Sequence, residues 1–313
     1  MANYQIITDS GSDLSSRQLT ELGVVCVPLY VNFRNESLAD SVDEGIKTLY
    51  DGLRAGEAAS TSAINPARWG AAMEEALAQG QDVVVVTFSS GLSTTYQSAV
   101  IAADELREKY PGRKILVVDS LCASLGQGLL IWYACKKRDE GLSAEDLAAW
   151  LEENKLRLCH WFTVDDLMYL KRGGRVSAAT ALVGTLLNIK PVLHVDNEGH
   201  LINVAKARGR KASLQALAAK LGQLGEGFDN STIFISHGDS EEDAKYLAEL
   251  LKEQYGVKEA VIGYVGAVIG SHSGPGTMIQ YNIVSVFFIY ILNFYHFLPS
   301  FFQVEKIVLS IQQ

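Results

Sequence analysis

The sequence predicts an α/β protein with two domains, of which the first is built on a parallel, doubly wound sheet. In the first half, short apolar runs rich in Val and Ile alternate with helical segments, and Asp, Ser or Thr follows most of these runs. An apolar run between turn residues is typical of a strand buried on both faces, as in parallel sheets. The second half contains strands that could pair as a hairpin, which indicates a mixed sheet in a second α/β domain.

The expected elements of the first half follow one another as strand and helix units. The expected strands are Tyr4–Thr8, Val24–Val31, Val83–Thr87 and Lys114–Ser120. The expected helices are 15–22, 42–53, 67–78, 97–109, 123–137 and 144–155. Pro28 interrupts the second strand and indicates an edge position or a bend, whereas Ser143 is placed to cap the last helix. Residues 59–66 are polar and end in a proline, so we expect a loop there.

The second half is expected to form the mixed-sheet domain. Its expected strands are Leu158–Val164, Ile189–Val195, Leu201–Val204, Thr232–His237 and Ala260–Val265. Its expected helices are 166–171, 178–187, 210–221 and 241–254, and the small apolar residues of 178–187 favour a buried helix. We therefore place the domains at residues 1–157 and 158–277, followed by an atypical apolar tail at 278–313.

Composition and charge exclude several classes of function. The chain has 313 residues and a formal charge of −9, which argues against nucleic acid or an anionic membrane surface as the main partner. The four cysteines are widely spaced and form no CxxC pair, so we expect no zinc site and reduced thiols, as in a cytoplasmic protein. The N-terminus lacks the basic and apolar regions of a secretory signal.

The tail contains a candidate membrane span. Residues 283–302 carry no charged side chain, and their length and apolarity suffice for a transmembrane helix. Asn293, His296 and Pro299 weaken that interpretation, as does the absence of a basic flank. We expect no stable membrane insertion.

The hydroxyl-rich stretch Ser89–Tyr96 is the strongest candidate for a binding site. It follows an apolar strand and precedes a helix, the place where open α/β sheets bind ligands. Free backbone N–H groups at the start of a helix favour an anion, and five hydroxyls in seven residues add neutral donors. Helix capping alone would need one or two of them. The stretch therefore predicts a site for an anion or a carboxylate.

Other polar residues allow both a functional and a structural interpretation. Asp9 and Asp119, at strand ends, could bind a metal or a ribose, but we favour simple acceptance of backbone N–H bonds in their turns. His272 lies between two serines and could donate a hydrogen bond or titrate. No G-x-S-x-G, G-x-G-x-x-G or phosphate-loop lysine motif occurs, so covalent and nucleotide chemistry lack a signature. Four arginines in polar turns are either solvated or form a docking patch for an acidic or phosphorylated partner: Arg172, Arg175, Arg208 and Arg210.

Seven short motifs, in this order along residues 3–277, together resemble the DegV family. They are Thr8-Asp9-Ser10 with Asp13-Leu14, Thr61-Ser62, Ser89–Ser93 with Thr95-Tyr96, Val118–Ser120, Gly174–Ser177, Lys190-Pro191 and His272–Gly276. Proteins of this family are the fatty-acid-binding subunits of bacterial fatty acid kinase. The resemblance implies a three-layer parallel N-terminal domain, a mixed-sheet C-terminal domain and one long-chain fatty acid between them.

The resemblance also implies roles for individual residues. Ser93 and Thr61 would donate hydrogen bonds to the fatty-acid carboxylate, and His272 would complete that network. Ser62 and Thr94 are further candidates, and the helices after Ser120 and Ser177 would line the acyl chain. Two arginines would face the kinase partner, which brings ATP and magnesium: Arg175 and Arg208. The chain itself would be a carrier without a cofactor, a metal or a catalytic residue.

The sequence departs from the family in two places. Thr94 stands where a second glycine is usual, so its side chain would narrow the approach to the carboxylate. After about Thr277 the family's closing helix is replaced by the apolar tail, which we interpret as an altered C-terminus without a function. Two other functions stay open: a small-molecule hydrolase or phosphotransferase at the same strand-end site, and a membrane-anchored interaction protein that uses residues 283–302.

Overall fold

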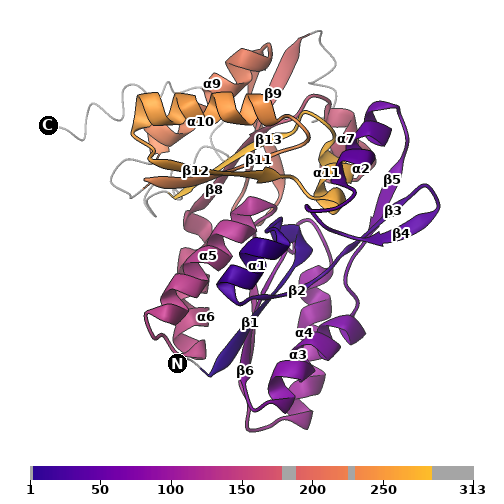
Figure 1. Ribbon diagram of the computed structural model, residues 1–313, viewed down its shortest axis with the longest axis vertical. Helices are drawn as coiled ribbons and strands as arrows, with labels where there is room; N and C mark the ends of the chain where they lie inside the picture. The colour runs from indigo at the N-terminus through magenta and orange to yellow at the C-terminus, as the bar shows by residue number, and fades with distance from the viewer. Residues whose placement is uncertain (1–2, 178–187, 225–229, 284–313) are drawn as a thin grey trace, which may run out of the picture.

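The parallel sheet of the first half has the predicted doubly wound architecture. The computed structural model describes residues 3–177, 188–224 and 230–283. The sheet runs, in spatial order, β2 (Val25–Val27), β1 (Tyr4–Asp9), β6 (Asp82–Thr87) and β7 (Ile115–Asp119). Two helices pack on one face of this sheet, α3 (Pro66–Ala78) and α4 (Thr95–Lys109). Two others pack on the opposite face, α5 (Leu125–Asp139) and α6 (Ala144–Asn154) (Figure 1). The run of valines in β6 is buried between these layers.

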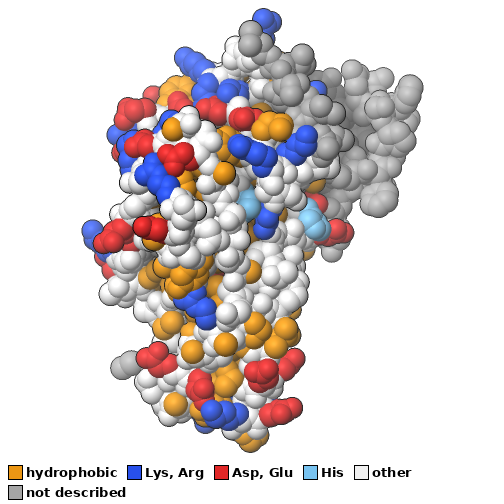
Figure 2. Space-filling model, turned by 90° about the vertical axis from the view of Figure 1, so that its right-hand side faces the viewer, with side chains coloured by type: hydrophobic (Ala, Val, Ile, Leu, Met, Phe, Trp, Pro, Cys, Tyr) orange, Lys and Arg blue, Asp and Glu red, His pale blue; other side chains and the backbone are white. Residues whose placement is uncertain are grey.

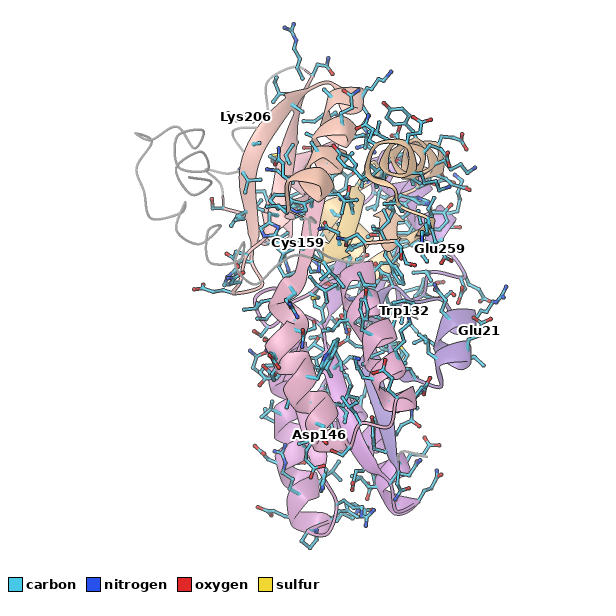
Figure 3. All side chains as sticks on the ribbon, turned by 90° about the vertical axis from the view of Figure 1, so that its left-hand side faces the viewer. Glu21, Trp132, Asp146, Cys159, Lys206 and Glu259 are labelled. Carbon is cyan, nitrogen blue, oxygen red and sulfur yellow. The ribbon has the colours of Figure 1, made fainter. Side chains whose placement is uncertain are left out.

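The second half forms a mixed sheet, as predicted, with six strands where the sequence predicted five. Its order is β10 (Leu201–Arg208), β9 (Ile189–Val195), β8 (Leu158–Thr163), β13 (Met278–Ile283), β11 (Thr232–His237) and β12 (Glu259–Tyr264). Only β11 and β12 are parallel neighbours. The helices α9 (Arg210–Leu224) and α10 (Glu241–Tyr255) bury one face, and Figure 3 shows α5, marked by Trp132, beneath the sheet on the other side.

The strand β13 corrects the expectation for the tail. It lies in the middle of the sheet, antiparallel to both β8 and β11, and its residues are buried except at the end. The chain is therefore structured for six residues beyond Thr277. The rest of the tail and the expected helix at 178–187 lie outside the described residues. Within the described residues, no helix has the length and apolarity that crossing a bilayer requires.

A small antiparallel sheet, not predicted from the sequence, projects from the first half. It consists of β4 (Glu36–Ala39), β3 (Tyr30–Phe33) and β5 (Ala59–Ser62), so the loop expected at 59–66 begins with a strand. The chain bends at Pro28 and passes from β2 in the large sheet to β3 in the small one. The expected helix at 42–53 is α2 (Ile46–Arg54), which starts four residues later than predicted.

Short elements connect these layers. The helix α1 (Ser16–Leu22) begins with a capping box between Ser15 and Gln18, and Ser143 caps α6 as expected. The remaining short helices are η1 (Ser10–Ser12), η2 (Lys155–Arg157), α7 (Leu167–Arg172) and α11 (Ala267–Ser273). The helix α11 belongs to the second half by sequence but packs against α2, β3 and β5 of the first half (Figure 1).

Three carboxyl groups are buried near α11, where the two halves meet. Asp9 accepts hydrogen bonds from the backbone N–H groups of Phe88 at 2.7 Å and Gly11 at 3.0 Å. Asp13 accepts a hydrogen bond from Ser124, and burial raises the pKa of both Asp13 and Asp40. Burial, opposed by the backbone N–H of Phe88, raises the pKa of Asp9 to about 7.

We expect acidification to stabilise the protein through Asp9. The carboxyl binds its proton at higher pH in the folded chain than in the unfolded chain, where its pKa is 3.8. Its contribution to the free energy of unfolding is therefore largest below about pH 4 and is lost as the pH rises to about 7. Urea unfolding from about pH 5 to 8 should show a loss on the order of 1 kcal/mol in the wild type. The variant Asp9→Asn should show a smaller loss; an equal loss in both proteins would contradict the assignment.

Candidate functional site

A cavity of about 460 Å³ lies between the two halves of the chain. Its floor comes from the ends of the parallel strands, its roof from the six-stranded sheet, and one side from α11 and β5. Its wall is mostly apolar, formed by Leu29, Ala63, Phe88, Leu92, Ala123, Phe162, Leu170, Val195, Leu201, Val268, Ile269 and Ile279. Its volume is in the range of sites for small organic ligands.

Six predicted site residues lie on this cavity, although they come from distant segments. Thr61 and Ser62 come from β5, Ser93 and Thr94 precede α4, and Arg175 and His272 come from the second half. Figure 2 shows histidine side chains at the surface next to Lys and Arg, on the face that carries the small sheet. The seventh residue, Arg208, is exposed at the end of β10 and does not line the cavity.

A hydrogen bond between Thr61 and His272 is one of the contacts that join the two halves at the cavity. Thr61 Oγ1 lies 2.7 Å from Nε2 of His272. The imidazole packs closely on Gly173, where a Cβ atom would overlap Nδ1, so a side chain at that position would displace the ring. Burial, together with the charge of Arg175, lowers the pKa of His272 to about 4. The neutral ring therefore offers one N–H donor and one acceptor.

The other hydroxyls near the cavity are partly engaged with neighbours. Ser93 Oγ lies 2.8 Å from Oγ1 of the buried Thr95. Asn32 donates to Ser62 Oγ over 3.3 Å, on the exposed side of β5. Thr94 is exposed at the start of α4 and makes no side-chain cap to that helix. Apart from Thr61, Ser93 is thus the best-placed hydroxyl donor that the first half contributes to the cavity.

The hydroxyl-rich stretch has a second role that the sequence analysis missed. Ser89 Oγ is fully buried and donates to the carbonyl of Gly199, at the turn between β9 and β10, over 3.0 Å. Gly91 also lies against this turn, where a Cβ atom would come 2.7 Å from the carbonyl oxygen of Glu198. Only part of the stretch therefore faces the cavity, and the rest holds the hairpin of the second half in place.

Arg175 lies at the cavity rather than on an open surface. Its guanidinium donates to the carbonyl of Leu92 from Nε at 3.2 Å and from Nη2 at 2.9 Å. Burial lowers the pKa of the guanidinium. These bonds tie the second half to the turn before α4, and they place a positive charge beside His272.

A second histidine on the cavity was not predicted. His160 is buried on β8, and its Nε2 accepts a hydrogen bond from the backbone N–H of Ala123 at 3.4 Å. Burial, and then the neighbouring His194, lowers the pKa of His160 to about 3, so its ring is neutral. The alternation of β8 could have indicated it, since His160 and Phe162 face the cavity while Trp161 faces away.

The two strand-end aspartates have the structural role that we favoured. Asp9 accepts backbone bonds as described, and Asp119 accepts from the N–H groups of Ser90 at 3.1 Å and Leu121 at 3.2 Å. Within the described ranges, no group of three or more His, Cys, Asp and Glu is placed to hold a metal ion. The polar side chains of the cavity lining are therefore hydroxyls, two imidazoles and one guanidinium.

Replacing Arg175 should make His272 easier to protonate. In the ligand-free protein, Arg175→Gln removes the repulsion between the guanidinium and the imidazolium, so the pKa of His272 should rise from about 4. A pH titration of the imidazole resonances by NMR, in the wild type and in Arg175→Gln, measures this shift. An unchanged His272 titration would show that burial alone sets its pKa.

Comparisons with known proteins agree with this architecture. The family model for uncharacterised proteins of the DegV family matches residues 3–281. A DegV domain-containing protein of Clostridium perfringens is 45% identical over 280 residues, which cover 89% of this chain and 96% of the relative.

Two solved structures have the same fold. A fatty-acid-binding DegV family protein from Thermus thermophilus is 36% identical, with a TM-score of 0.81, covering 90% of this chain and 100% of that one. The fatty acid kinase (Fak) B3 protein of Streptococcus pneumoniae, loaded with linoleic acid, is 25% identical, with a TM-score of 0.78, covering 91% and 100%. This chain therefore belongs to the DegV family.

Proposed function

We propose that this protein binds one long-chain fatty acid in the cavity between its two halves. A single observation carries the proposal: one cavity combines a mostly apolar wall with hydrogen-bonding groups that include Thr61, Ser93 and His272, which we call its polar end. A fatty acid has the same two parts, a carboxylate and an acyl chain. Relatives that bind fatty acids and share the fold support this assignment.

The polar end suits a carboxylate. A buried carboxylate needs hydrogen-bond donors for its oxygens, and hydroxyls with a neutral imidazole supply them without forming a tight ion pair. We assign Thr61, Ser93 and His272 as the main donors, with Ser62 and Thr94 at the entrance. Arg175 adds positive potential nearby while it remains bonded to Leu92.

We further propose that the protein presents this carboxylate to an ATP-dependent fatty acid kinase in the cytoplasm. The carboxylate oxygen would attack the γ-phosphorus of ATP on the kinase, which yields an acyl phosphate and ADP. This chain would then be the carrier and not the catalyst. The similarity to the Fak B3 protein supports a kinase partner. Arg208, exposed on β10, and Arg175 are our candidates for contact with that partner.

A hydrolase or phosphotransferase is the second candidate function. The contact of 2.7 Å between Thr61 and His272 has the geometry of a nucleophile and its base. However, Nδ1 of His272 packs against Gly173, and the cavity lining contains no Asp or Glu that would orient the ring. Turnover of acyl esters by the purified chain alone, lost in His272→Ala, would favour this alternative over the carrier.

The binding assignment predicts selective losses of affinity. After removal of bound lipid, calorimetric titration with oleate should show one site in the wild type. Ser93→Ala and Thr61→Val each remove one hydrogen bond to a charged group, worth about 1.5–3 kcal/mol, so each should weaken binding at least tenfold. Ser98→Ala on α4 and Thr20→Val on α1 are matched controls away from the cavity and should bind oleate as the wild type does. Equal affinity in all five proteins would contradict the assigned donors.

The partner assignment predicts a defect that spares lipid binding. Arg208→Glu should reduce acyl phosphate formation with a fatty acid kinase subunit and ATP, because it reverses an exposed charge outside the cavity. Its affinity for oleate should match that of the wild type. Arg17→Glu, on the exposed face of α1, controls for net charge. Full acyl phosphate formation by Arg208→Glu would exclude Arg208 from the docking surface.

A further inference from the structure

Asp40 lies outside the cavity but holds two segments that form its wall. It follows β4 and is 6% exposed. Its Oδ1 accepts a hydrogen bond of 3.0 Å from the backbone N–H of Val268, at the start of α11. Its Oδ2 accepts a bond of 2.8 Å from Ser10 Oγ, which in turn accepts one of 3.0 Å from the N–H of Leu29. Val268 and Leu29 both line the cavity.

The helix α11 transmits this anchor to the ligand site. Asp40 fixes its first turn, and His272 in its last turn reaches Thr61 on β5. Tyr50 of α2 donates to the carbonyl of Val265, just before α11, over 2.8 Å, and its hydroxyl lies beside Gly270 in the middle of the helix. A seven-residue helix held at both ends by the first half has little freedom to shift.

We propose that Asp40 is a positioning residue of the fatty-acid site, which sets the location of His272 through α11. This inference rests on the proposed function. Through Asp40, which follows β4, it makes the small sheet part of the fatty-acid site. Loss of the carboxyl leaves the N–H of Val268 without its acceptor in a buried place. The helix would then move toward another acceptor or water, and the distance from His272 to Thr61 would no longer be fixed.

A simple role in stability would have different consequences. An anchor that only stabilises the fold would lower the unfolding temperature without altering the affinity of the folded protein for its ligand. A positioning residue acts through His272, so its removal should matter only while His272 is present. A double-mutant cycle between Asp40 and His272 separates these two roles.

The experiment measures oleate affinity in four proteins: the wild type, Asp40→Ala, His272→Ala and the double variant. Introduced into the wild-type protein, Asp40→Ala should weaken oleate binding about tenfold. Introduced into the His272→Ala variant, it should weaken oleate binding less than twofold, because residues in one network are energetically coupled. Asp40→Asn keeps an acceptor for Val268 and should restore affinity to within about twofold. Asp43→Ala is the control: Asp43 accepts a hydrogen bond from the N–H of Ser16 of α1 and not from α11, so this variant should bind oleate as the wild type does.

Two further measurements keep the inference testable if Asp40→Ala does not fold. Ser10→Ala removes the bond to Oδ2 and should weaken oleate binding in the same direction. In ligand-free protein, the NMR resonances of the His272 ring should shift or broaden in Asp40→Ala or Ser10→Ala but not in Asp43→Ala. Equal losses of affinity with and without His272, or unchanged His272 resonances, would overturn the inference. A wild type that binds no oleate would refute the proposed function, whereas the His272 resonances would still decide the role of Asp40.

Discussion

The hydrogen bond between Thr61 and His272 joins residues that are 211 positions apart, and the cavity depends on that contact. It exists because α11, which also contacts α7 of the second half, packs on α2 and on the small sheet of the first half. Gly173 admits the ring and Asp40 fixes the far end of the helix. The polar end of the cavity is therefore assembled by docking between the two halves and not by either half alone.

The electrostatics of this junction suit the fatty-acid carboxylate that we propose as the ligand. The imidazole of His272 is neutral because it is buried and because Arg175 lies nearby. A neutral donor with two hydroxyls can hold a carboxylate and still leave an oxygen free to react with a phosphoryl group. Arg175 is retained by the carbonyl of Leu92, so its charge acts at a short distance without chelating the ligand. The apolar wall is complementary to the acyl chain of the proposed ligand.

The sequence was sufficient for the parallel sheet and for five strands of the six-stranded sheet, because most of those strands are apolar runs between turn residues. It missed β13, in which Gln280 and Asn282 interrupt the apolar pattern. It failed where structure depends on long-range pairing. Residues 59–62 are polar, and only their pairing with β3 makes them a strand. No helix was expected around His272, yet this residue lies at the end of α11, whose seven residues are too few to give a strong local signal. The role of Ser89 in holding a distant hairpin could not be read from its neighbours.

Native mass spectrometry of the purified wild-type chain tests the central claim most directly. The account predicts a major species heavier than the bare chain by the mass of one long-chain fatty acid, which is released as the free acid on extraction with organic solvent. A spectrum of the bare chain alone, before and after incubation with oleate, would contradict the account.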